Sequence, residues 1–236
     1  MRLPVAATRR AFSATLLSAL AAIGRDGVIT PLPIAWAADA TSAVGSVDPV
    51  TAKVTSRCFL DVSIGNVNAG RIVIDLFGEV APATTENFRQ LCTGEKGFGY
   101  SGSSFYRIID GVTIQGGNIA SGDGGSSKDA ANSGRSIYGP TFPHENYALS
   151  HSVEGLISMV NSGKGGSSKE SDSRFLIQLV ADGGWADGRY PAFGRVIQGM
   201  DVVRKVEAVD VKGTSNKPVT PVSITAAGEI PLSAGA

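Results

Sequence analysis

Few residues in this sequence belong to the types that perform covalent or metal chemistry. Among 236 residues there are two histidines, His144 and His151, and neither has an accompanying set of metal ligands, so we expect no metal site. Two segments rich in glycine, serine and lysine, 120–134 and 163–173, look superficially like phosphate-binding loops. Neither segment has the spacing of a nucleotide-binding loop, in which four residues separate the first glycine from a Gly-Lys-Ser/Thr triplet. Both are therefore expected to be surface loops.

The two cysteines raise the question of a disulfide bond. Cys58 lies in an expected strand and Cys92 near the end of an expected helix. A bond between them is possible in an oxidising compartment, but the sequence does not show whether their Cα atoms are close enough. Two independent buried thiols are the favoured interpretation, and the disulfide stays open as the alternative.

Composition excludes several classes of protein. The 21 basic residues balance the 21 acidic ones, so nothing suggests a nucleic-acid partner, which usually requires a basic excess. A hydrophobic share of 42% is enough for a sizeable core and argues against a disordered chain. The 30 glycines and the low charged share of 18% are typical of a turn-rich, mainly β globular protein.

The first forty residues have the pattern of an export signal. Arg9 and Arg10 precede the apolar run 14–24, and small residues suited to cleavage follow at 35–40. The run is too short to span a bilayer, which needs about 20 residues. We predict a twin-arginine signal over 1–37, with an amphipathic helix as the alternative. No more than peripheral membrane contact is expected.

Removal of the predicted signal changes the charge of the chain. It takes away four arginines and one aspartate, which leaves 17 basic and 20 acidic residues and a net charge of −3. We expect a flexible leader over 38–53, one domain over 54–232 and a short tail over 233–236.

The remaining chain reads as many short strands and two helices. A turn is expected at 66–70, one helix at 83–93 after Pro82 and before Gly94, and a second helix at 200–206. Short apolar runs separated by glycine-rich turns favour a closed or nearly closed β architecture. The expected strands are 54–64, 71–76, 105–109, 112–114, 156–160, 175–180, 193–196 and 222–227.

Ordered strings of residues across 54–232 resemble the cyclophilins, a family of peptidyl-prolyl cis–trans isomerases. The strings include Glu86-Asn87-Phe88-Arg89, Thr93-Gly94-Glu95-Lys96-Gly97-Phe98-Gly99-Tyr100, Phe105-Tyr106-Arg107-Ile108-Ile109, Gln115-Gly116-Gly117 and Trp185-Ala186-Asp187-Gly188. The resemblance implies a closed eight-stranded antiparallel β-barrel capped by two α-helices, with a groove on its outer face. It also implies a monomeric isomerase that assists protein folding, acts on proline-containing polypeptides and needs no cofactor.

The resemblance assigns roles to individual residues. Arg107 occupies the position of the family's catalytic arginine, and Gln115 and Asn161 match the glutamine and the asparagine that bind the substrate. Several groove residues depart from the family pattern: a Phe-Met pair of the pocket floor is Val112-Thr113 and a second pocket Phe is Leu176, so the pocket has less aromatic surface. The substrate-binding positions in this sequence are Val112, Thr113, Val160, Arg174, Leu176, Trp185 and Tyr190.

These departures predict a weakened isomerase. Less aromatic surface for the proline ring lowers its affinity, since a large buried side chain contributes roughly 1.5–3 kcal/mol. Cyclosporin binding should be weak for the same reason. A non-catalytic proline-peptide binding module or assembly factor with the same fold is the alternative. A second guanidinium in the groove, from Arg174, would also favour acidic peptides.

The export signal and the C-terminal string Ala227-Gly228-Glu229-Ile230 make the chain most similar to the cyclophilins of the thylakoid lumen. That resemblance implies a location in the chloroplast thylakoid lumen, with a bacterial periplasm as the alternative.

Overall fold

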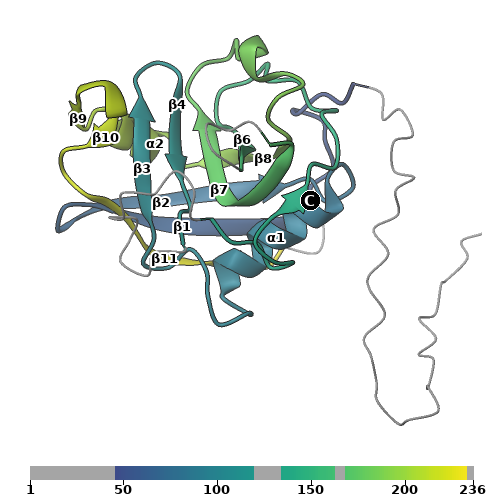
Figure 1. The fold of residues 1–236 in the computed structure, drawn as a ribbon, viewed down its shortest axis with the longest axis horizontal. Coiled ribbons are helices and arrows are strands. Elements are labelled where there is room, and N and C mark those ends of the chain that lie inside the picture. The colour runs from purple at the N-terminus through teal and green to yellow at the C-terminus, as the bar shows by residue number, and fades with distance from the viewer. Residues whose placement is uncertain (1–45, 120–133, 163–167, 233–236) are drawn as a thin grey trace, which may run out of the picture. The chain divides into compact units, whose positions relative to one another are not determined.

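A computed structural model describes residues 46–119, 134–162 and 168–232 (Figure 1). The helices are α1 (Pro82–Thr93) and α2 (Met200–Glu207), and two short 3-10 segments are η3 (Gly184–Ala186) and η4 (Gly213–Ser215). The strands are β1 (Ser56–Ile64), β2 (Val67–Leu76), β3 (Ser104–Ile109), β4 (Thr113–Gly116), β5 (Phe142–Pro143), β6 (Leu156–Asn161), β7 (Glu170–Gln178), β8 (Ala192–Gln198), β9 (Val211–Lys212), β10 (Lys217–Pro218) and β11 (Val222–Ile230).

Eight of these strands form a closed antiparallel barrel. Their order is β4-β3-β11-β1-β2-β8-β6-β7, and the pairing of β4 with β7 closes the ring. Strand β5 continues the sheet from β7, and β9 and β10 form a separate hairpin. Helix α1 packs mainly on β1 and β11, and α2 packs on β2, β3 and β4. The predicted eight-stranded barrel with two helices is confirmed.

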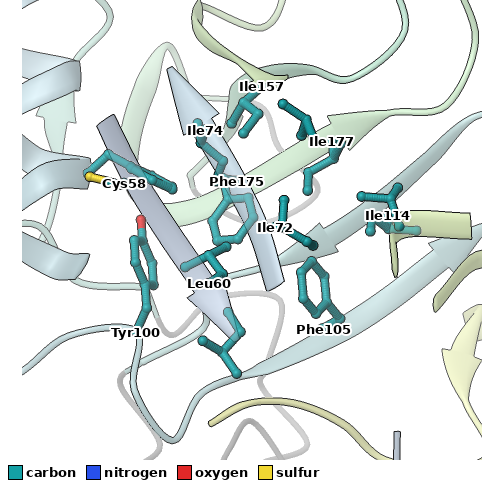
Figure 2. Packing of buried hydrophobic residues seen from close by; sticks show 14 of the residues in the cluster. Cys58, Leu60, Ile72, Ile74, Tyr100, Phe105, Ile114, Ile157, Phe175 and Ile177 are labelled. Atoms are coloured by element: carbon teal, nitrogen blue, oxygen red, sulfur yellow. The ribbon is translucent and has the colours of Figure 1, made fainter. Parts of the chain in front are cut away.

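The barrel interior is filled by alternate residues of its strands. On β7, Phe175 and Ile177 point into the core, whereas Leu176 between them is not part of this cluster (Figure 2). Phe175 makes edge-to-face contacts with Phe88 at 5.4 Å and with Tyr100 at 5.3 Å between ring centroids. Because neighbouring strand residues face opposite sides, this packing places Arg174, Leu176 and Gln178 on the outer face of the barrel, where they are covered by other parts of the chain.

Helix α1 begins and ends where its sequence predicts. Pro82 is its first residue, and Gly94 terminates it with a φ of 72°, which favours glycine. Its N-cap, Ala81, has no side chain able to accept a hydrogen bond. The carboxylate of Glu145 takes that role, accepting the amides of Ala83 at 2.9 Å and Thr84 at 2.7 Å. The helix start is therefore capped by a residue far along the chain.

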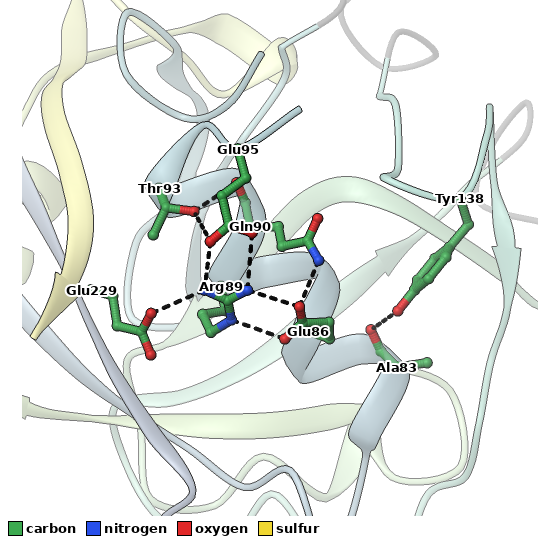
Figure 3. A network of polar contacts seen from close by, with 8 residues as sticks. All are labelled: Ala83, Glu86, Arg89, Gln90, Thr93, Glu95, Tyr138 and Glu229. Carbon is green, nitrogen blue, oxygen red and sulfur yellow. Dashed lines mark hydrogen bonds and ion pairs between the residues drawn. The ribbon is translucent and has the colours of Figure 1, made fainter. Parts of the chain in front are cut away.

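An arginine on α1 ties this helix to the barrel. Arg89 pairs with Glu86 at 2.8 Å, with Glu95 at 2.7 Å and with Glu229 of β11 at 3.0 Å (Figure 3). These carboxylates raise the pKa of the Arg89 guanidinium, with the hydrogen bond to Glu86 as the largest cause. One cation thus joins the helix, the loop after it and the last strand.

Several boundaries differ from the sequence prediction. Strand β2 begins at Val67, because its pairing with β1 continues into the predicted turn. Ala69 is the extra residue there, between the pairs Val62–Gly70 and Ser63–Asn68. Strand β7 begins at Glu170, within the segment 163–173 that was expected to be a loop. The end of the expected leader is anchored: the Val47 amide donates to the Ala148 carbonyl at 2.9 Å.

Cys58 and Cys92 are both free and buried in the core. They are separate buried thiols, as the favoured interpretation predicted, and burial raises the pKa of Cys92. In the part of the chain that the structure describes, no helix has the length and apolar character needed to cross a membrane.

Candidate active site

Several of the predicted site residues lie on the outer face of β3, β4, β7 and β6. The strand register places Arg107 opposite Gln115, Gln115 opposite Leu176, and Leu176 opposite Ser158. Residues directly opposite one another on antiparallel strands share a face, so these four form one row across four strands. Arg107 is half-buried, and Gln115 keeps 9% of its surface exposed.

An irregularity in β3 brings two side chains to this row. Phe105 pairs with Gly116 and Arg107 pairs with Gln115, so Tyr106 is an extra residue without a partner on β4. Such a bulge re-aims the side chains beside it. The Tyr106 hydroxyl donates to the Gln115 Oε1 atom at 3.4 Å. Gln115 therefore accepts a hydrogen bond from Tyr106, the extra residue of the bulge, and lies opposite Arg107, the residue that follows it.

The expected pocket floor lies one row further along the same strands. Thr113 pairs with Ile109 on one side and Gln178 on the other, and Val112 precedes it in the turn after β3. Thr113 is fully buried and Leu176 is 1% exposed, whereas Val112 is half-buried. The Thr113 hydroxyl finds no hydrogen-bond partner among the described residues. The floor is thus closely packed but carries an unsatisfied polar atom.

Trp185 and Tyr190 lie together on the segment that follows β7. Their rings meet edge to face, with centroids 5.8 Å apart, and Trp185 is 42% exposed. Gln178 anchors the loop before β6, since its amide nitrogen donates to the carbonyls of His151 and Val153 at 2.9 and 3.1 Å. The Gly183 amide of the segment after β7 donates to the same His151 carbonyl at 2.8 Å. An outward residue of β7 therefore holds the loops beside the groove.

A chain of Ser158, His151 and Asp187 braces the same region. His151 Nε2 lies 2.8 Å from the Ser158 hydroxyl, and Nδ1 lies 2.8 Å from Asp187 Oδ1. The order resembles a hydrolase triad, but Ser158 is completely buried and cannot reach a substrate. Burial lowers the pKa of His151, although the hydrogen bond to Asp187 opposes this. No pattern in the sequence indicates this role of His151, because Asp187 is 36 residues away along the chain.

The last groove residues lie at the end of β6. Asn161 pairs with Ser171 of β7, and Val160 precedes it where the register between these strands is irregular. The Ser162 amide donates to the Glu170 carbonyl at 2.7 Å. Of the two segments expected to be surface loops, 120–134 and 163–173, residues 120–133 and 163–167 lie outside the described residues.

Arg174 is buried and paired. Its Nη2 atom lies 2.6 Å and its Nε atom 3.0 Å from the carboxylate of Asp172, and both residues are 2% exposed. The expected preference for acidic peptides assumed that this guanidinium adds uncompensated charge to the groove. That premise does not hold, because Asp172 neutralises the charge.

Comparison with known proteins gives two findings. Residues 59–229 match the family described as cyclophilin type peptidyl-prolyl cis-trans isomerase/CLD. The chain is 46% identical over 187 residues to peptidyl-prolyl cis-trans isomerase CYP21-1 of Arabidopsis thaliana, a match covering 76% of this chain and 77% of that protein.

Proposed function

The chain belongs to the cyclophilin-type peptidyl-prolyl cis–trans isomerases, and from this premise we propose that Arg107, Gln115 and Asn161 form its catalytic set. The observation that carries the proposal is the register of β3 and β4, which puts Arg107 directly opposite Gln115 on the outer face of the barrel. The enzyme assists protein folding by acting on proline-containing polypeptides.

The reaction breaks no covalent bond. Its barrier of about 18–20 kcal/mol reflects the amide resonance that is lost when the C–N bond twists. A cation can stabilise the twisted amide, whose nitrogen lone pair is no longer delocalised, and Arg107 supplies that charge. Gln115 and Asn161 hold the peptide so that one side of the bond stays fixed while the other turns.

We further propose that the activity is reduced. Val112, Thr113 and Leu176 stand where larger side chains were expected from the family resemblance, and Val160, Arg174, Trp185 and Tyr190 complete the groove. A small floor offers the proline ring less apolar contact, which weakens peptide binding. Weak binding of cyclosporin follows from the same small floor.

The decisive experiment measures cis–trans exchange of an Ala-Pro peptide with the wild type and Arg107→Ala. Loss of the charge that stabilises the transition state is expected to lower kcat/KM about 100-fold. Arg71→Ala is the matched control, since this exposed arginine pairs with Asp61 on β1. Equal exchange rates for wild type and Arg107→Ala would refute catalysis and favour the non-catalytic binding module.

The location is proposed from the sequence. The arginine pair, the apolar run and the small residues of 1–37 support export to the thylakoid lumen, with the bacterial periplasm as the alternative. Fractionation of the source cells, with detection of the processed chain, checks this location. Recovery of an unprocessed chain from the cytosol would contradict it.

A further inference from the structure

Asp172 and Arg174 form an ion pair within one short stretch of β7. The Arg174 guanidinium donates to both carboxylate oxygens of Asp172, with Nε at 3.0 Å from each and Nη2 at 2.6 Å from Oδ2. The backbone amide of Arg174 also donates to Asp172 Oδ1, at 2.7 Å. A buried arginine with this many charge-assisted bonds is held in one place and is electrically balanced.

The pair occupies an irregular part of the barrel. Met159 of β6 pairs with Phe175, but Asn161 pairs with Ser171, so three residues of β7 face Val160 alone. The carboxylate of Asp172 satisfies the Arg174 amide at this irregularity, whereas the Asp172 carbonyl accepts from Asn87 Nδ2 at 3.0 Å.

The surroundings leave the carboxylate little freedom. Gly134 packs directly against Asp172, since a Cβ atom added there would lie 2.0 Å from its Oδ1 atom. The Asp172 side chain is therefore fixed by its glycine neighbour as well as by Arg174.

From Arg174 the contacts lead to the catalytic set. The Arg174 charge acts on the Tyr106 hydroxyl, where it opposes the rise in pKa that burial causes. Tyr106 in turn donates to Gln115 Oε1, which leaves the Gln115 amide nitrogen as the donor for a substrate carbonyl. Gln115 lies opposite Arg107. Among the described residues, Tyr106 and Gln115 thus connect the surroundings of the buried ion pair with the catalytic arginine.

We propose that Asp172 is a specificity-determining residue of this isomerase. By neutralising Arg174, it keeps a second positive charge out of the groove, so the enzyme does not favour acidic residues before proline. The inference rests on the proposed role of Arg107 and Gln115. It makes Asp172 and Arg174 a matched pair, in which the loss of either charge changes substrate choice and the loss of both restores it.

The test is a four-protein cycle of wild type, Asp172→Asn, Arg174→Gln and the double variant. Each protein is assayed on a Glu-Pro and an Ala-Pro peptide. The quantity compared is kcat/KM for the Glu-Pro peptide divided by kcat/KM for the Ala-Pro peptide. The ratio should be near one for the wild type, rise about tenfold in Asp172→Asn and fall below one in Arg174→Gln. In the double variant it should return to the wild-type value.

Asp61→Asn is the matched control. It removes an aspartate that also pairs with an arginine, Arg71, but on β1 and β2, and its ratio should equal that of the wild type. An unchanged ratio in folded Asp172→Asn, or a double variant that keeps the altered ratio, overturns the proposal.

Two complications are covered by the same proteins. Thermal unfolding shows which variants fold. If Asp172→Asn does not fold, Arg174→Gln and the double variant decide the question: the peptide ratio must still fall in Arg174→Gln and return to the wild-type value in the double variant. If the wild type shows no catalysis, the proposed function fails separately. The ratio of the two peptides' Kd values, measured by NMR titration, then tests the effect of Asp172 by itself.

Discussion

Thr113 brings a hydroxyl group into the proposed floor of the proline pocket, where it is fully buried and finds no hydrogen-bond partner among the described residues. A buried polar group without a hydrogen-bond partner lowers the stability of the folded state by about 1–3 kcal/mol. Thr113→Val keeps the shape and removes the unsatisfied group, so we expect the free energy of unfolding to rise by about 1 kcal/mol. Chemical denaturation measures the change.

The matched control is Thr84→Val on α1. Thr84 is equally buried, but its hydroxyl donates to Glu145 Oε2 at 2.7 Å, so the same change should lower the free energy of unfolding by about 1 kcal/mol. A loss of stability in both variants would show that the Thr113 hydroxyl is satisfied in solution.

The start of helix α1 depends on a carboxylate from outside the helix. Glu145 accepts the Ala83 and Thr84 amides, and α1 has no acidic residue of its own in the first turn. A negative charge at a helix N-terminus also interacts favourably with the helix dipole. Glu145→Ala should therefore lower the free energy of unfolding by about 1–2 kcal/mol.

Glu79→Ala provides the comparison for this element. Glu79 is an exposed carboxylate paired with exposed Lys53, and such surface pairs contribute about 0–1 kcal/mol. Denaturation of both variants by urea compares the two losses. Equal losses would indicate that Glu145 acts as an ordinary surface charge and not as a cap.

The stability of the whole molecule should depend on pH through its two histidines. Burial lowers the pKa of His144 and His151 in the folded protein, where Lys169 and Glu170 act on His144 and Asp187 on His151. The unfolded chain, with histidine pKa near 6.5, then binds more protons in this range. The free energy of unfolding should therefore be highest above pH 6.5 and fall as the pH drops through the folded pKa values.

Denaturation curves recorded from pH 7.5 to pH 5 check this dependence. His144→Gln and His151→Gln should each reduce the slope, because each removes one group that takes up protons on unfolding. A stability that stays constant over this range would contradict the assignment of both histidines as neutral in the native state.

The sequence by itself determined the barrel, both helices and the family, because these depend on local periodicity, helix termini and ordered strings of residues. It also predicted the Arg107 and Gln115 positions, which the strand register brings together. Only the tertiary structure showed that Asp172 neutralises Arg174, that Glu145 caps α1 and that Ser158, His151 and Asp187 form one chain. The physical reason is that hydrogen bonds and ion pairs require atoms within about 3 Å. Strand irregularities and loop paths bring such atoms together, and neither is encoded in spacing along the chain.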